Sequence, residues 1–194
     1  ASWSVTDSLP YDSTYLDGKF GAWLEGNAVV TPDGNVADLL RVDYAPGPEY
    51  AALIRLRDSV SFDPFDPEKN FVRMPGGAKK FTVRYDSLSG RYWSLVNYVT
   101  QEWAGKQNPA WVRNTLALSS SPNLQEWTVH RTVLHHPDIA KHGFQYADWL
   151  FDGNDIVLLS RTAYDDNGTG AHNCHDANYM TFHRIKDFRK ALTE

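Results

Sequence analysis

Short apolar runs rich in Val, Tyr, Trp, Thr and Leu alternate along the whole chain with clusters of Gly, Pro, Asn and Asp, and helical periodicity is scarce. This pattern predicts an all-β protein. One or two helical turns are expected only at residues 187–192. The predicted strands are residues 28–31, 36–43, 50–56, 80–86, 92–99, 113–119, 126–134, 146–151, 156–161 and 177–184.

Tight turns at residues 32–35, 87–90 and 151–154 each join two apolar strands. Their glycines, at positions 34, 90 and 153, are 56 and 63 residues apart. Asp-Gly and Ser-Gly provide the positive φ that a short hairpin turn requires. In addition, the sequence of residues 3–8 is echoed 124 residues later, at 127–132, which is two units of 62. A repeat of this length predicts a β-propeller built from four-stranded antiparallel blades.

The repeat divides the chain into blades at about 21–75, 76–135 and 136–190, with the remnant of a preceding blade at 1–20. A strand is therefore expected around Trp3, and the innermost strands are expected to begin near Glu25, Lys80 and Tyr146. Because a closed propeller needs at least four blades, we expect the N-terminal blades to lie outside this chain. The alternative is a β-sandwich with accidental periodicity.

Composition narrows the functional classes. The chain has 194 residues and a net charge of −5, with 42% hydrophobic and 22% charged residues, which indicates a globular protein without the basic surface of a nucleic-acid binder. No apolar run approaches the roughly 20 residues of a membrane helix, so no membrane span is expected. The single cysteine, Cys174, excludes an intramolecular disulfide, and the N-terminus lacks the pattern of a signal peptide.

Three constellations can carry chemistry. Glu25 starts an inner strand, and Arg41 follows 16 residues later, after a hairpin. Propeller geometry can bring both side chains to the central mouth, although Glu25 as a turn cap and Arg41 as a solvated residue remain an alternative. Arg113 opens a strand that leads through a polar turn to Trp127. Tyr146 begins the strand that leads into the third hairpin.

The first two constellations resemble elements of the sialidase superfamily. Residues 25–41 contain a Glu, a Val-Val strand, a Pro-Asp-Gly turn and an Arg at the spacing found there. Residues 113–127 resemble the next sialidase arginine followed by a degenerate Asp-box, in which the Ser and Trp remain and the usual Asp and Gly are replaced within 121–124.

The rest of the chain continues this resemblance. Tyr146, with its apolar strand and the following Asp152-Gly153 turn, resembles the catalytic tyrosine element, and residues 177–185 resemble the closing strand. The order of the motifs is that of the C-terminal half of a sialidase, and it spans nearly the whole chain. The resemblance thus implies about three blades of a six-bladed propeller, in a secreted or periplasmic protein.

The resemblance implies an exo-acting glycoside hydrolase for acidic glycans, with Tyr146 as nucleophile, Glu25 as its general base, and Arg41 and Arg113 holding the substrate carboxylate. A neutral phenol suits this chemistry, because an anionic nucleophile would be repelled by the substrate carboxylate. The family's first arginine and acid/base aspartate belong to blades before residue 1. The expected partners are thus a glycan substrate and the N-terminal half of the propeller, with no cofactor, and the fragment alone is expected to be inactive.

The chain departs from the family after the third hairpin. Arg161 stands where the family often has a Tyr-Glu pair, and a polar loop at 164–176 follows. Arg161, His172, His175 and Asp176 are candidate substrate contacts. A metal site formed by His172, His175 and Asp176 is not favoured, since their spacing matches no recognised metal motif and no helix aligns them.

Two other functions remain open. One is a propeller polysaccharide lyase, in which Tyr146, Arg113 and His172 would act on a uronate. The other is a non-catalytic glycan-binding propeller. Reaction products would separate the three, because only a hydrolase releases a monosaccharide and only a lyase releases an unsaturated uronide.

Overall fold

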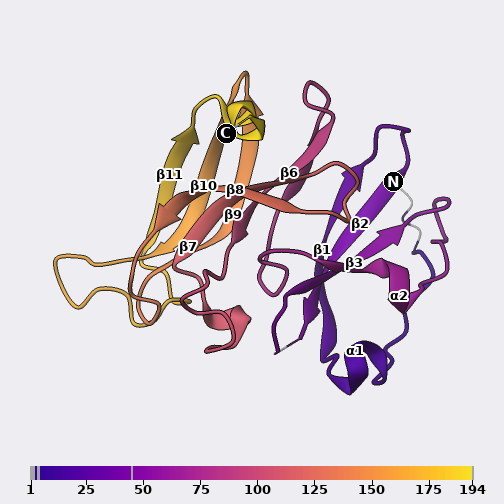
Figure 1. The fold of residues 1–194 in the computed structure, drawn as a ribbon, viewed down its shortest axis with the longest axis horizontal. Helices are drawn as coiled ribbons and strands as arrows, with labels where there is room; N and C mark the ends of the chain where they lie inside the picture. Colours follow the sequence, from indigo (N-terminus) through magenta and orange to yellow (C-terminus); the bar gives the residue numbers. More distant parts are fainter. Residues whose placement is uncertain (1–2, 4, 45, 194) are drawn as a thin grey trace.

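The computed structural model describes residues 3, 5–44 and 46–193. Figure 1 shows three β-sheets following one another through the molecule, from the indigo and purple strands to the orange and yellow ones. The elements are α1 (Tyr15–Gly18), β1 (Ala22–Val30), β2 (Val36–Asp43), β3 (Tyr50–Arg55), α2 (Pro67–Asn70), β4 (Phe71–Arg73), β5 (Val83–Asp86), β6 (Arg91–Asn97), η1 (Pro109–Trp111), β7 (Thr115–Ser121), β8 (Thr128–His135), β9 (Gly143–Asp152), β10 (Asp155–Ala163), β11 (Tyr179–Ile185) and η2 (Phe188–Leu192).

Each sheet is an antiparallel meander of consecutive strands. The orders are β1-β2-β3-β4, β5-β6-β7-β8 and β9-β10-β11. The predicted hairpin turns are present, with Gly34, Gly90 and Gly153 at φ of +83°, +64° and +62°. The all-β prediction is confirmed, and the three sheets are blades of a β-propeller.

The structure corrects the predicted strands in three places. β4 was not predicted, because its three residues are too short to show a pattern. The third sheet has three strands where four were expected. No strand precedes Ala22 in the described part of the chain, and Trp3 is 95% exposed. The similarity of residues 3–8 to 127–132 does not produce a strand, because a strand needs a paired neighbour, and among the described residues the one bond between backbones here joins Asp7 to Val60.

The first strands of the three sheets, β1, β5 and β9, are neighbours. The side chain of Asn27 on β1 hydrogen bonds to both backbone groups of Val83 on β5, at 3.1 and 3.2 Å. Before and within β5, Thr82 and Arg84 donate to backbone carbonyls of β9, at 3.2 and 2.6 Å. These bonds satisfy polar groups along the inner edges of the sheets and fix β1 and β9 on either side of β5.

Two apolar cores lie between the sheets. One joins the first sheet to the second, through residues such as Leu39, Leu53 and Val96, and the other joins the second to the third, through Trp93, Leu118 and Trp149. The second sheet is therefore covered on both faces. No helix in the described residues is long and apolar enough to cross a membrane.

Candidate functional site

Tyr146 is displayed by an irregularity in β9. The register between β9 and β10 shifts between the pairs Asp148–Leu159 and Gln145–Arg161, so that two residues of β9 lie opposite one of β10. This is a β-bulge, a feature that bends a strand and re-aims a side chain. Tyr146 occupies it with φ of +51°, a left-handed conformation that is unusual for a bulky residue.

Two arginines lie near the Tyr146 ring. The Cζ atom of Arg161, on β10, is 5.5 Å from the ring centroid, and that of Arg113, which precedes β7, is 5.9 Å away. The structure thus brings together three of the predicted site residues, contributed by two sheets.

Arg113 is held from several sides. Its Nη1 donates to Oε1 of the buried Gln145 at 3.1 Å, and its carbonyl accepts from the backbone of Phe144 at 2.9 Å. A Cβ atom at Gly143 would lie 3.2 Å from the Arg113 Cβ and 2.4 Å from the Cys174 carbonyl oxygen, so only glycine fits there.

The two arginines lack anionic partners. Within the described residues, neither Arg113 nor Arg161 forms an ion pair. Arg113 is only 5% exposed, and its Nε has no hydrogen-bond acceptor. Burial lowers the pKa of Arg113, and the positive charges of Arg41 and Arg161 act in the same direction. The cluster is therefore suited to an incoming anion such as a carboxylate.

The Tyr146 hydroxyl contacts the polar loop that follows β10. It lies 3.3 Å from Nε2 of His175. Gln145 positions this part of the loop by donating to the carbonyls of Cys174 and His175, at 3.0 and 2.7 Å. Desolvation, followed by the charges of Arg113 and Arg161, lowers the pKa of His175. The neutral imidazole is therefore the favoured form of His175.

Asp176 lies behind His175. Its Oδ1 is 3.7 Å from His175 Nδ1, while Asn173 accepts from the backbone N–H groups of both residues at 2.8 and 2.9 Å. His172 does not join the site. Its side chain is 89% exposed, and it faces Asp176 at 3.4 Å rather than Tyr146.

Glu25 and Arg41 meet each other across the first hairpin. Arg41 Nη1 lies 3.1 Å from Glu25 Oε1, and Arg41 Nε donates to the carbonyl of Ala78 at 2.8 Å. Desolvation opposes ionisation of Glu25, but hydrogen bonding and the charge of Arg41 outweigh it and lower the pKa. Among the described residues no hydrogen bond joins Glu25 to Tyr146, so the structure shows the predicted general base paired with an arginine.

A buried ion pair supports the loop beneath Arg41. Lys79 is fully buried and pairs with Glu49, which also accepts from the backbone of Gly76 at 2.9 Å. Lys79 additionally donates to the Pro109 carbonyl at 3.0 Å. Removing one member of such a pair lowers the free energy of unfolding by about 3–5 kcal/mol. The pair therefore stabilises the position of Ala78, whose carbonyl binds Arg41.

Sequence reasoning missed Gln145 and Lys79. Gln145 precedes the candidate tyrosine in an otherwise apolar strand, and a polar residue at such a position indicates a buried hydrogen-bonding role. Lys79 gave no signal, because its partner Glu49 is 30 residues away. The group of residues spaced for a metal ion, His136, His142 and Asp165, also lies outside this site.

Comparison with known proteins gives matches in structure only. No protein-family model matches the sequence, and no curated protein matches it. An alpha-L-arabinanase of Penicillium chrysogenum, solved with arabinobiose, matches with a TM-score of 0.54 at 11% identity, covering 91% of this chain and 49% of that one. An alpha-L-arabinofuranosidase from Fusarium graminearum, solved with an iminosugar inhibitor, matches with a TM-score of 0.52 at 9% identity, covering 91% and 48%.

A leech intramolecular trans-sialidase, solved with 2,7-anhydro-Neu5Ac, matches with a TM-score of 0.48 at 14% identity, covering 87% of this chain and 24% of that one. The chain spans about half the length of the two fungal enzymes. The similarity confirms the expected β-propeller fold.

Proposed function

We propose that this chain forms part of a glycoside hydrolase that acts on acidic glycans. The observation that supports this most is the pair of arginines beside Tyr146, neither of which forms an ion pair with another described residue. Buried positive charge without a counter-ion is unfavourable, and a carboxylate on the substrate would supply one. The two fungal enzymes share the fold and act on arabinose sugars, which are uncharged, so the arginines favour a different substrate class here.

In the proposed mechanism Tyr146 is the nucleophile. Its phenolic oxygen attacks the anomeric carbon as the bond from that carbon to the aglycone oxygen breaks, and the phenolic proton passes to Nε2 of His175. An acid outside the residues gathered at Tyr146 protonates the departing oxygen, and Asp176 stabilises the imidazolium from the other side of the ring. Water then breaks the glycosyl–tyrosine bond and gives its proton to the conjugate base of that acid, while His175 returns its proton to the Tyr146 oxygen.

Glu25 has a place in either of two versions of this mechanism. As the general base it would have to leave Arg41 and reach the Tyr146 hydroxyl. As observed, it fixes Arg41, whose second role would be to hold the substrate carboxylate together with Arg113. The contact between Tyr146 and His175 favours the second version.

The proposed enzyme includes more of the propeller than this chain. The chain covers about half of the two fungal propeller enzymes, and the acid that protonates the leaving group is not among the residues gathered at Tyr146. We therefore propose that further blades supply this acid, that the 194 residues alone are inactive, and that the complete enzyme meets its glycan outside the cell.

The test uses the complete protein with sialosides, uronate-containing oligosaccharides and arabinan as substrates. Tyr146→Phe removes only the hydroxyl and should lower kcat/KM by about 10³-fold or more on an acidic substrate. His175→Gln should lower it by about 10²–10⁴-fold, and Glu25→Gln by less. If Glu25→Gln lowers kcat/KM more than His175→Gln does, Glu25 is the general base. Full activity of Tyr146→Phe would exclude the mechanism.

The pH profile gives a second test of His175. A proton acceptor must be neutral, and the lowered pKa of His175 keeps it neutral to a pH below its ordinary value of about 6.5. Activity should therefore fall only as the pH drops below that value. His175→Gln should abolish this acidic limb, while His172→Gln should keep it.

One observation favours a second function. A tyrosine in contact with a neutral histidine, next to arginines, is also an arrangement that can remove the proton beside a uronate carboxylate and eliminate the glycosidic bond. Such a lyase would release an unsaturated product that absorbs in the ultraviolet. Appearance of that absorbance instead of a reducing monosaccharide would replace the hydrolase with the lyase.

A further inference from the structure

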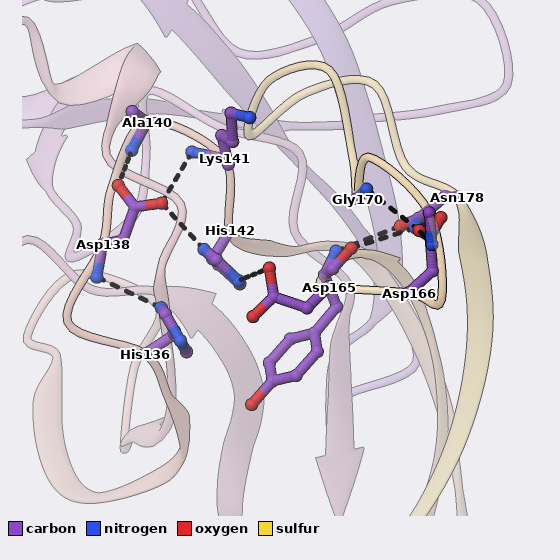
Figure 2. Close-up of polar contacts among 11 residues, drawn as sticks. His136, Asp138, Ala140, Lys141, His142, Asp165, Asp166, Gly170 and Asn178 are labelled. Atoms are coloured by element: carbon purple, nitrogen blue, oxygen red, sulfur yellow. Dashed lines mark hydrogen bonds and ion pairs between the residues drawn. The ribbon is translucent and has the colours of Figure 1, made fainter.

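Two histidines and a carboxylate gather where three segments of the chain meet (Figure 2). His136 follows β8, His142 directly precedes β9, and Asp165 follows β10. One potential ligand atom from each residue lies within 4.8 Å of the others. The two histidines lie in the short connection between β8 and β9, but the approach of Asp165 does not follow from sequence spacing, because β9 and β10 separate it from them.

His142 is prepared to act as a ligand. Its Nδ1 lies 2.8 Å from Oδ2 of Asp138, whose carboxylate is held in turn by backbone N–H groups of Ala140 and Lys141, at 2.8 and 3.2 Å. The hydrogen bond to Asp138 places a proton on Nδ1 and leaves the lone pair on Nε2. A carboxylate behind a histidine in this way is the usual arrangement around histidines that bind metals.

Among the described residues, the Nε2 atom of His142 has no hydrogen-bond partner. The side chain is only 6% exposed. It faces Oδ1 of Asp165 at 3.4 Å, as Figure 2 shows. A lone pair and a carboxylate oxygen repel each other at this distance unless a positive charge lies between them, and that charge is supplied either by a proton on Nε2 or by a metal ion bound to both atoms.

His136 completes the group. Its ring stacks on that of His142 with centroids 3.5 Å apart and 17° between the planes. Because an imidazole binds a metal in its own ring plane, His136 has to turn out of this stack to share an ion with His142. The Nδ1 atom of His136 accepts a hydrogen bond from the backbone N–H of Asp138 at 3.1 Å, which places the proton of the neutral ring on Nε2. Coordination through Nε2 would move that proton to Nδ1, so the bond from Asp138 would be lost when the bond to the metal forms. Asp165 is 74% exposed and begins a loop, so it can move inward to shorten the distances between the ligand atoms.

We propose that His136, His142 and Asp165 bind one divalent transition-metal ion, with Zn²⁺ as the best match. Two imidazoles and one carboxylate suit zinc and leave a fourth position for water. The hard ions Mg²⁺ and Ca²⁺ prefer sites made of oxygen atoms, which this group is not. Asp165 is 74% exposed, which gives the ion a path from solvent.

The ion would fasten the loop of residues 164–178 to the start of β9. The loop is already shaped by Asp166, which accepts from Gly168, Gly170 and Asn178 at 2.7, 2.9 and 3.1 Å. It carries His175, and β9 carries Tyr146, four residues after His142. The metal is thus a positioning device for the Tyr146–His175 contact, and this consequence, but not the binding itself, rests on the proposed function.

Binding is tested by calorimetry on the full-length protein after treatment with a chelator. Zn²⁺ should bind with one high-affinity equivalent that depends on the three residues, and Mg²⁺ should not bind there. Asp165→Asn and His142→Ala should each weaken this equivalent by about 100-fold, and Asp138→Asn by about 10-fold. Asp165 is exposed, so its variant tests the site even where His142→Ala impairs folding.

His172→Ala is the matched control, because His172 is an exposed histidine on the same loop beside an aspartate. It should bind Zn²⁺ as the unaltered protein does. Absence of saturable Zn²⁺ binding, or binding that survives Asp165→Asn and is lost in His172→Ala, would overturn the proposal. Because no glycan enters this measurement, its outcome is independent of whether the hydrolase proposal holds.

Discussion

At the scale of single residues, backbone strain and chemistry coincide at Tyr146. A non-glycine residue in the left-handed region costs about 1–3 kcal/mol, and it persists only where surrounding structure enforces it. Here the bulge in β9 enforces it, and the result is that the phenol lies among Arg113, Arg161 and His175. Such strain at a displayed side chain is typical of functional positions.

The strain predicts an inverted order of stability between two variants. Tyr146→Gly should be more stable than Tyr146→Ala by about 1 kcal/mol, because glycine adopts φ of +51° without penalty. Tyr85, a half-buried tyrosine on β5 without positive φ, is the matched control, and there the alanine variant should be the more stable by about 0.5–1 kcal/mol. Urea unfolding measures both pairs. The same order at both positions would mean that Tyr146 is unstrained.

The sequence predicted some of the site and not the rest, for a physical reason. Glu25 and Arg41 were expected at the central mouth, and their positions on the two strands of one hairpin explain why they pair with each other instead of Glu25 with Tyr146. The contact between Tyr146 and His175 depends on how a long loop folds back over β9, and no local pattern encodes that. The bulge is likewise invisible in the sequence, because Tyr146 stands where glycine would normally signal it.

At the scale of elements, the C-terminal turn η2 is fastened to the second sheet. Arg189 makes two bonds to the buried Asp86 at the end of β5, at 2.7 and 2.6 Å. Ser89 donates to the same carboxylate through its backbone and its hydroxyl, at 3.0 and 2.6 Å. Desolvation alone would raise the pKa of Asp86, but these bonds outweigh it and lower the pKa to about 2.

This pair predicts how stability depends on pH. Since the folded pKa lies below the unfolded value of about 3.9, the stabilisation is complete above about pH 4 and is lost as the pH falls through about 2. We expect Asp86→Asn to lose about 1–2 kcal/mol at pH 7, allowing for solvent screening, and to flatten the pH dependence between 4 and 2.

Asp152→Asn provides the control, since Asp152 pairs with Arg184 through a side chain that is 56% exposed. Its cost should stay below about 1 kcal/mol. Thermal unfolding from pH 2 to pH 7 compares the two variants. Equal costs would show that the bond between η2 and the second sheet is no stronger than a surface ion pair.

Strands could be predicted from the sequence where Gly, Pro, Asn and Asp bounded an apolar run. Ten strands were predicted on that basis, and each has a counterpart in the structure. β4 escaped because three residues carry no periodicity, and the strand expected around Trp3 failed because similarity to residues 127–132 does not supply a neighbour to pair with. A strand is stabilised by its ladder, and the ladder is made by residues distant in sequence.

At the scale of the whole molecule, the outer faces of the end sheets differ. The outer face of the first sheet is covered by an aromatic cluster that includes Phe20, Tyr15 and Phe65. The outer face of the third sheet exposes Leu150, Leu159, Met180 and Phe182, which are 58%, 48%, 66% and 62% exposed. Leu159 and Phe182 are directly paired across β10 and β11, so they form one continuous patch. Patches of this kind mark contact surfaces.

If further blades cover this patch, as the proposed enzyme requires, one substitution should have opposite effects in two forms of the protein. In the 194 residues expressed alone, Phe182→Asp should reduce aggregation and dye binding, because it removes exposed apolar area. In the complete protein it should lower the free energy of unfolding by several kcal/mol, since it would bury an unpaired charge between blades. Leu88→Asp is the control, because Leu88 is 78% exposed in a hairpin turn and should change neither form. If the Tm of the complete protein is unchanged in Phe182→Asp, this face stays in solvent, and the further blades do not pack against it.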